Sequence, residues 1–320
     1  MQTLRDIGEA GLIERIKARA RRANRSWVAI GIGDDAAVLR PASGKDLVVS
    51  ADTLVEDVHF RWKTQAAATV GRRALAVNLS DLAAMGARPL GCTLALAAPP
   101  ELSVQTALSI VEGLVSEAEK WRSPLVGGNV TRARETSLAV TVFGVLPRGR
   151  ALRRGDVRAG DRLCVTGRLG GAALDWMRAE REGASIRRVP QPRLEAGSRL
   201  LATKGHGGCV DLSDGLIRGL EELLKGTGLG AEIEAKAIPR ARGLVAGARR
   251  LKLDPEVLAL TGAEDYELLF ALRSRAESTA RLAGRLRVPI SQIGRVVRAP
   301  GIAGVPQAIL RHGWEPFAIR

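Results

Sequence analysis

Paired and regularly placed carboxylates are the groups in this sequence best suited to chemistry. Asp34 and Asp35 stand side by side in the stretch GIGDDAAVL, between a glycine-flanked turn and an apolar run. Two adjacent carboxylates repel each other, and burying them costs free energy unless a positive group neutralises them. The stretch therefore predicts a loop that binds a cation.

Further acids lie at the ends of predicted strands and in the turns that follow them. Asp52 ends the run VVSAD, and Asp211 and Asp214 bracket the strand-to-helix turn DLSD. Carboxylate oxygens are hard ligands that suit Mg²⁺, and one Mg²⁺ usually takes only one or two of them from the protein. Several acids therefore predict several metal ions, or a metal bound to a polyphosphate. The alternative for each single Asp or Ser is a helix or turn cap.

Glycine-rich stretches supply the second ingredient of a phosphate site. GIG, VGGN and TGRLGG place flexible backbone beside predicted strands, where a loop can approach phosphate oxygens closely. Neither the G-x-x-x-x-G-K-[ST] loop nor the dinucleotide G-x-G-x-x-G pattern occurs. A nucleotide bound here would need a different architecture.

The bulk composition narrows the class of protein and its partners. The chain has 320 residues and a formal net charge of +15, yet only 3% of its residues are aromatic. Stacking platforms for bases are therefore scarce, and nucleic acid is not expected as the main partner. No apolar run approaches a membrane span, and MQTLRDIGEAGLIERI has no apolar leader segment. Three scattered cysteines favour a reducing cytoplasm.

The elements that must position these groups form two α/β halves. Apolar spacing predicts helices over 65–86 and 103–121, each following or preceding a β-rich run. The stretch 147–161 is rich in Pro, Gly and Arg and has no apolar period, so it marks a boundary. We therefore expect an α/β protein of mixed sheets with two domains, 1–148 and 149–320.

Six ordered motifs resemble those of the thiamine-monophosphate kinase family, within the superfamily of aminoimidazole ribonucleotide synthetase. The motifs are GIGDDAAVL, DTLVEDVHF, ALAVNLSDLAAMGA, LVGGNVTR, DLSDGL and TGAEDYELLF, and the resemblance runs from about Gly8 to Trp314. It implies an N-terminal domain whose sheet forms a shared barrel in a homodimer, and a C-terminal domain that covers the site. It also implies ATP-dependent phosphorylation of thiamine monophosphate to thiamine diphosphate, by direct in-line transfer with several Mg²⁺.

The resemblance also implies roles for individual residues. The residues with catalytic roles would be Asp35, Asp52, Asp211 and Asp214. The metal positions would be Asp35, Ser50, Ala51, Asp52, Asp81, Asn129, Asp211 and Asp214. ATP would contact Gly128, Arg154 and Ser213, and the thiamine end would contact His59, Glu264 and Trp314. From the residues alone, a purely structural role stays open for four of these residues. His59 would then be a satisfied histidine beside a strand, and Arg154 an exposed arginine of the linker. Glu264 would start a strand, and Trp314 would pack near the end of the chain.

The sequence departs from the family pattern at three positions. Asn129 stands where an aspartate is expected to bind metal, Ala51 replaces a usual threonine, and Ala263 replaces a usual glycine. Asn can still offer a carbonyl oxygen, but one negative charge is lost. We expect the same metal cluster with a weaker site, or with fewer ions.

The implied chemistry is physically consistent, because a phosphate acceptor is already anionic and needs no strong base. The obstacle is repulsion between two anions, which bridging metal ions would neutralise while aligning the transfer. This requires acids from both halves of the chain to converge. Two alternatives remain: another ATP-dependent enzyme of the superfamily that acts on a phosphorylated acceptor, and a non-catalytic, basic, dimeric binding protein.

Overall fold

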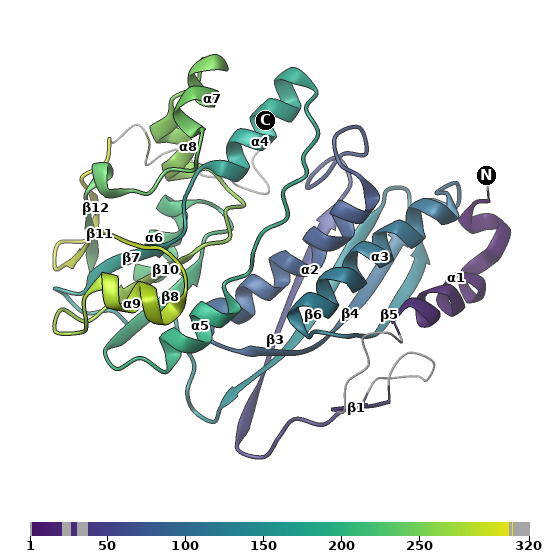
Figure 1. Ribbon diagram of the computed structural model, residues 1–320, viewed down its shortest axis with the longest axis horizontal. Coiled ribbons are helices and arrows are strands. Elements are labelled where there is room, and N and C mark those ends of the chain that lie inside the picture. Colours follow the sequence, from purple (N-terminus) through teal and green to yellow (C-terminus); the bar gives the residue numbers. More distant parts are fainter. Residues whose placement is uncertain (1, 21–26, 31–37, 307–308, 310–320) are drawn as a thin grey trace. The chain divides into compact units, whose positions relative to one another are not determined.

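The computed structural model describes residues 2–20, 27–30, 38–306 and 309, and it divides into two compact units (Figure 1). The first unit comprises Met1–Leu82, Ala87–Gly149 and Ser185–Val189. The second comprises Ala83–Gly86, Arg150–Ala184 and Pro190–Arg320. Both units mix helices with sheets, and each is described by itself below.

The first unit is built on a four-stranded sheet in the order β3-β6-β4-β5. Only the β4–β5 pair is parallel. The helices α2 and α3 cover one face of the sheet, and α1 lies beside α3 (Figure 1). A short antiparallel pair, β1 and β2, accompanies them. The elements are α1 (Leu4–Ala20), β1 (Val28–Ile30), β2 (Val38–Leu39), β3 (Lys45–Val55), α2 (Ala67–Ala84), β4 (Arg88–Ala98), α3 (Val104–Trp121), β5 (Leu125–Arg132) and β6 (Ser137–Pro147).

The core of the first unit follows the two periodicities expected of its elements. On β6 the residues Leu138, Val140 and Val142 are buried, whereas the residues between them are partly exposed. Alternate side chains of a strand point to opposite faces, so this sheet buries one face under its helices. Helix α3 is capped by Ser103, whose hydroxyl accepts a hydrogen bond from the Thr106 N–H at 3.0 Å.

The second unit is built on a six-stranded sheet in the order β12-β9-β11-β7-β10-β8, with only β12–β9 parallel. Helices α4, α6, α7 and α8 pack against one another, and α5 packs with α9. The elements are β7 (Arg162–Thr166), α4 (Gly171–Glu182), α5 (Leu194–Leu201), β8 (His206–Asp211), α6 (Leu216–Leu224), β9 (Gly230–Ile233), the 3-10 turn η2 (Ala235–Ala237), α7 (Leu244–Arg250), α8 (Pro255–Thr261), β10 (Leu268–Leu272), α9 (Thr279–Leu286), β11 (Ile290–Val297) and β12 (Gly301–Ala303).

The expected fold class is confirmed, and the predicted helices over 65–86 and 103–121 are present as α2 and α3. Both helices lie within two residues of the predicted bounds, because their apolar stripes are long and regular. Among the described residues, no helix is both long and apolar enough to cross a membrane.

Candidate functional site

Two of the predicted metal residues are in contact in the first unit, and a third lies on the same face of the same strand as one of them. The Ser50 hydroxyl on β3 donates a hydrogen bond to Oδ2 of Asp81 on α2, at 2.5 Å. Asp52 lies two residues after Ser50 on the same strand, and therefore on the same face of the sheet. Asp52 is exposed, whereas Ser50 and Asp81 are half-buried. The result is a cluster of hard oxygen donors at the helix-covered face of β3.

Strand pairing places Ala51 and Asn129 on the opposite face of that sheet. Ala51 is adjacent to Ser50 on the strand, so its side chain points the other way. Asn129 on β5 pairs with Ala95 on β4, which pairs with Ala139 on β6 and, through it, with Thr53. Paired residues share a face, so Asn129 lies on the same face as Thr53 and Ala51. Within one chain, two of the three departures from the family pattern therefore lie across the sheet from Ser50.

Gly128 has a structural reason to be glycine as well as a predicted contact with ATP. It pairs with Leu94 on β4. A Cβ atom at this position would lie 1.9 Å from the Leu94 carbonyl oxygen, so no larger residue fits without moving the strand. The backbone at Gly128 therefore packs more closely against its neighbour than any side chain would permit.

His59 is held in a tight turn just beyond β3. Its Nδ1 accepts a hydrogen bond from the Val55 N–H at 3.1 Å, so the neutral ring carries its proton on Nε2. The His59 carbonyl accepts a hydrogen bond from Nη1 of the buried Arg73 at 3.1 Å. In the same turn, Asp57 has a φ of 60°. The turn thus fixes the tautomer of His59, with the ring proton on Nε2.

The second unit contributes the DLSD turn at the end of β8. Asp211 closes the strand and is only 6% exposed, and the Ser213 hydroxyl donates to Oδ2 of Asp214 at 3.2 Å. Gly215, with a φ of 93°, then leads into α6. A Cβ at this glycine would lie 2.7 Å from the Thr261 carbonyl carbon, so the sharp turn into the helix requires glycine.

Backbone hydrogen bonds join this turn to the segment AEDYE. The Leu212 N–H donates to the Glu267 carbonyl at 2.8 Å, and the Tyr266 N–H donates to the Leu212 carbonyl at 3.0 Å. The Glu264 N–H donates to the Ser213 carbonyl at 2.6 Å. The predicted metal turn and the predicted substrate segment of the second unit are therefore one connected structure.

The AEDYE segment is strained, and α4 secures it. Glu264 and Tyr266 have φ values of 68° and 50°, a left-handed conformation that costs a residue with a side chain roughly 1 kcal/mol. The Asp265 carboxylate accepts from the N–H groups of Gly170 at 2.6 Å and Ala172 at 3.2 Å, and so caps the helix. Strain of this kind is concentrated at functional sites, where the surrounding structure maintains it.

A buried ion pair supports the same segment from the other side. Glu267 is 6% exposed, and the Arg193 guanidinium contacts both of its carboxylate oxygens, at 2.6 Å and 2.5 Å. The Thr166 hydroxyl adds a third hydrogen bond at 2.6 Å. Sequence reasoning missed Arg193, because nothing in the pattern PQPRLEAG distinguishes it from a surface arginine.

Arg154, the predicted ATP contact near the domain boundary, has an acidic partner on α6. Its Nη1 lies 2.8 Å from Oε2 of Glu222. Burial acts to raise the pKa of Glu222, but the nearby Lys225 and Arg154 outweigh it and hold that pKa below its ordinary value. Both members of the pair are well exposed, so the arginine is oriented without being locked.

Two predicted site residues, Asp35 and Trp314, lie outside the described residues. Within the described ranges, no group of three or more His, Cys, Asp or Glu side chains is arranged to hold a metal. The expected convergence of acids from both halves stays a prediction, because the structure describes each unit separately.

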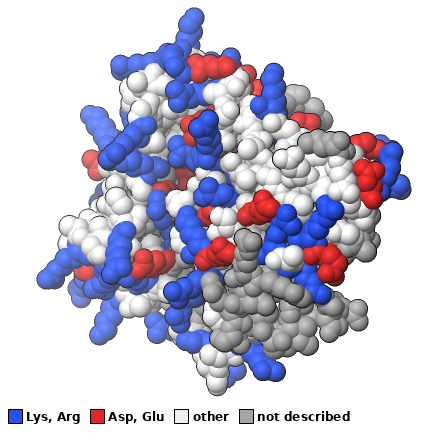
Figure 2. Space-filling view, turned by 45° about the vertical axis from the view of Figure 1, so that its right-hand side comes forward, with Lys and Arg blue, Asp and Glu red and all other residues white. Residues whose placement is uncertain are grey.

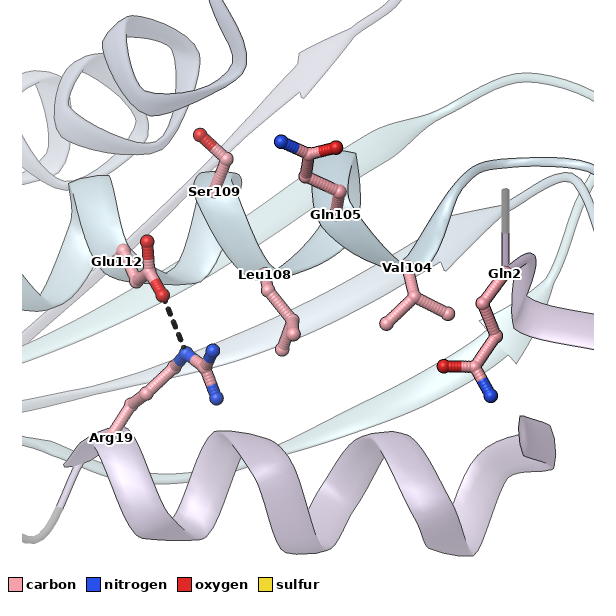
Figure 3. Close-up of a pocket in the computed structure, with 7 residues that line it drawn as sticks. All are labelled: Gln2, Arg19, Val104, Gln105, Leu108, Ser109 and Glu112. Carbon is pink, nitrogen blue, oxygen red and sulfur yellow. Dashed lines mark hydrogen bonds and ion pairs between the residues drawn. The ribbon is translucent and has the colours of Figure 1, made fainter. Parts of the chain in front are cut away.

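A groove of about 440 Å³ lies between α1 and α3 of the first unit (Figure 3). Its charged members, Arg19 and Glu112, pair with each other at 2.8 Å. None of the predicted site residues is among those that line it: Gln2, Arg19, Val104, Gln105, Leu108, Ser109 and Glu112. The groove therefore offers no unpaired charge to an anionic substrate.

On the face seen in Figure 2, basic side chains are numerous and acidic groups stand among them. Several arginines are paired, as in Arg250 with Glu182 at 2.6 Å and Arg295 with Glu232 at 2.6 Å. The cysteines are buried, and burial raises the pKa of the Cys92 and Cys164 thiols to about 12. These thiols are therefore protonated and unreactive near neutral pH.

Comparison with known proteins now adds to this geometry. The sequence matches the family models for the AIR synthase related protein, N-terminal domain over residues 33–146 and C-terminal domain over 158–305. A thiamine-monophosphate kinase of Synechococcus elongatus is 36% identical over 312 residues, which is 91% of this chain and 90% of that protein.

Two solved structures are similar over nearly the whole length of the chain. A thiamine-monophosphate kinase of Stenotrophomonas maltophilia is 37% identical and has a TM-score of 0.80, with 91% of this chain and 95% of that chain covered. AaThiL, solved as a complex with AMPPCP and TMP, is 26% identical and has a TM-score of 0.74, covering 95% of this chain and 96% of that chain.

Proposed function

The chain belongs to the thiamine-monophosphate kinases of the AIR synthase related family, and we propose that it transfers a phosphoryl group from ATP to thiamine monophosphate, giving thiamine diphosphate. The observation that carries this proposal is the similarity to thiamine-monophosphate kinases along nearly the whole chain. The relative solved with AMPPCP and TMP supports ATP as the phosphoryl donor and thiamine monophosphate as the acceptor.

The donor atoms of both units suit Mg²⁺. Ser50, Asp52 and Asp81 in the first unit, with Asp211 and Asp214 in the second, offer hydroxyl and carboxylate oxygens, which are the ligands that Mg²⁺ prefers. When bound, Mg²⁺ would neutralise the repulsion between the two phosphorylated substrates. Direct transfer then needs no strong base, because the acceptor oxygen is already anionic.

The remaining residues bind and orient the substrates in this proposal. In the second unit, Arg154 would supply a positive charge for the ATP phosphates and Ser213 a hydroxyl; in the first unit, the closely packed backbone at Gly128 would contact ATP. His59 presents its Nε2 proton, and Glu264 its carboxylate, to the nitrogen-rich thiamine end. A Mg-ATP enzyme with buried, free thiols also suits a cytoplasmic location.

We also propose that the protein forms a homodimer through the uncovered face of the first sheet. Leu47 and Val49 on β3 are 53% and 54% exposed, and they pair with Val145 and Phe143 on β6. An exposed apolar patch of this kind marks an interaction surface. The resemblance to the family names the partner as a second copy of this chain. Asn129 would then lie in or beside the dimer contact.

The test of the dimer is its mass in solution. Val49→Asp introduces a charge into the patch and should shift the protein toward the monomer in size-exclusion chromatography with light scattering. Asp46→Asn, at the second residue of the same strand, is the control and should leave the mass unchanged. A wild-type protein that is monomeric at all accessible concentrations would contradict the proposal.

The test of the activity uses purified protein, Mg-ATP and a panel of phosphorylated acceptors. Thiamine monophosphate should give the largest release of ADP, with formation of thiamine diphosphate that stops when Mg²⁺ is chelated. Unphosphorylated thiamine is the matched control. If ADP release favours another phosphorylated acceptor, the protein is a different enzyme of the superfamily. If no acceptor supports it, the non-catalytic alternative replaces the proposal.

A further inference from the structure

We propose that Trp176 is a positioning residue that determines how tightly the thiamine phosphate is bound, because its indole N–H holds the Glu264 carboxylate in place. This inference rests on the proposed function, and it assigns a role to a residue in α4 that the sequence motifs do not include. The bond joins Nε1 of Trp176 to Oε2 of Glu264 at 2.6 Å.

The bond attaches the strained segment to α4 at a second point. Asp265, the next residue, caps the beginning of the same helix through the N–H groups of Gly170 and Ala172. Trp176 lies more than one helical turn further along α4. The segment is thus attached to α4 through the Asp265 carboxylate and through the Glu264 carboxylate. The Glu264 carboxylate therefore has little freedom to rotate.

The chemistry of the donor makes this restraint specific. An indole N–H can only donate, so it requires an acceptor oxygen and occupies one of the two that Glu264 has. Hydrogen bonds to a charged acceptor are stronger than those between neutral groups. The thiamine end carries a cationic thiazolium ring and an aminopyrimidine, which an oriented carboxylate complements. A carboxylate that is already in position loses less conformational entropy when the ligand binds.

The central measurement is the kinetics of Trp176→Phe, which keeps an aromatic ring and removes the N–H. We expect the KM for thiamine monophosphate to rise about tenfold, the value that corresponds to one hydrogen bond to a charged group. The KM for ATP and kcat should stay within about twofold of wild type. Trp176→His, which retains a ring nitrogen able to donate, should recover part of the loss.

The chain offers a matched control in the first unit. Trp121 also donates its Nε1–H to a glutamate, Glu117, at 2.8 Å. Trp121→Phe therefore removes the same type of bond from a residue outside the proposed site. It should leave the KM for thiamine monophosphate unchanged, whatever it does to the melting temperature.

A double-mutant cycle separates positioning from general structural damage. If Trp176 acts through Glu264, Trp176→Phe should raise KM little further in a Glu264→Gln background, because the oriented charge is already absent. An equal rise in both backgrounds would contradict the inference. So would a KM for Trp176→Phe within twofold of wild type.

Calorimetric binding of thiamine monophosphate without ATP distinguishes this inference from the proposed function. A wild-type protein that binds the ligand without phosphorylating it contradicts the proposed function, and the Kd of Trp176→Phe then decides the inference. A wild type that turns over, with an unaffected Trp176→Phe, contradicts the inference alone. A wild type that neither binds nor reacts contradicts both.

Discussion

The two units hold their site residues in different ways. In the first unit, Ser50, Asp52 and Asp81 stand on a long strand and a long helix, whose regular geometry decides which way each side chain points. In the second unit, Asp211 ends the strand β8, whereas Asp214 and Glu264 stand on two irregular segments held by backbone hydrogen bonds, capping and an ion pair. We therefore expect site residues on regular elements to tolerate the loss of one supporting contact better than site residues on strained loops.

The largest expected effect is on catalysis, and substitutions in both units should lower kcat. Asp52→Asn and Asp211→Asn each remove a negative charge from a predicted metal ligand without changing its size. We expect each variant to lower kcat by orders of magnitude and to keep its circular dichroism spectrum, because only charge stabilisation in the transition state is lost. Near-native turnover in both variants would contradict the metal-cluster hypothesis.

The second expected effect separates the units by stability. Arg193→Met leaves the buried Glu267 carboxylate without its bidentate partner, and removing one member of such a pair costs about 3–5 kcal/mol. Arg72→Met in the first unit also removes an arginine from a buried glutamate, Glu117, at 1% exposure. There Lys120 and Trp121 still donate to the carboxylate, so we expect only about 1 kcal/mol.

Unfolding in urea, followed by circular dichroism, measures both losses. If Arg193→Met and Arg72→Met lower the free energy of unfolding by similar amounts, the irregular segments of the second unit are no more sensitive to a lost contact than the regular elements of the first. Thr166→Val serves as a further comparison in the second unit, because it leaves the arginine in place while removing one hydrogen bond from Glu267 and the one that the Thr166 hydroxyl accepts from the Leu268 N–H.

The third expected effect concerns the departure from the family pattern in the first unit. Asn129→Asp restores a carboxylate on the sheet face opposite Ser50. If position 129 lies near a metal, the concentration of Mg²⁺ required for half-maximal activity should fall severalfold, because a charged ligand replaces a neutral one. An unchanged Mg²⁺ titration would show that position 129 does not contribute to the metal site. Asn129→Ala, measured alongside, separates the added charge from the loss of the amide.

The contrast between the units also explains what the sequence could predict. Helices α2 and α3 follow from apolar spacing, and the shared face of Ser50 and Asp52 follows from the period of a strand. The same period separates Ala51 from them, a point that motif matching alone passes over. Motifs list residues in order, whereas a strand sends neighbours to opposite faces.

The supports of the second unit could not be predicted, because they join distant residues that follow no periodic pattern. The Arg193–Glu267 contact spans 74 positions, the Trp176–Glu264 bond 88, and the Asp265 cap of α4 95. Such contacts depend on how strands and helices are stacked, and a single sequence carries no signal for that arrangement. The motif TGAEDYELLF marked the segment as important without indicating that the side chains of Glu264, Asp265 and Glu267 are all held by structural partners.

The smallest expected effect tests the exposed ion pair of Arg154 and Glu222 in the second unit. The pKa of Glu222 lies below its ordinary value of 4.5 in the folded chain, chiefly because Lys225 and Arg154 outweigh the opposing effect of burial. A carboxyl whose pKa is lowered on folding contributes stability above its unfolded pKa and loses it as the pH falls through the folded pKa.

Glu222→Gln should therefore lower the melting temperature slightly near neutral pH, and the difference from wild type should vanish in acid. Melting curves between about pH 3 and pH 7 measure this. Because the pair is exposed, the effect should also shrink in high salt. A difference in melting temperature that is constant across the pH range would mean that Glu222 acts through packing. The charge of Glu222 would then not be what orients Arg154.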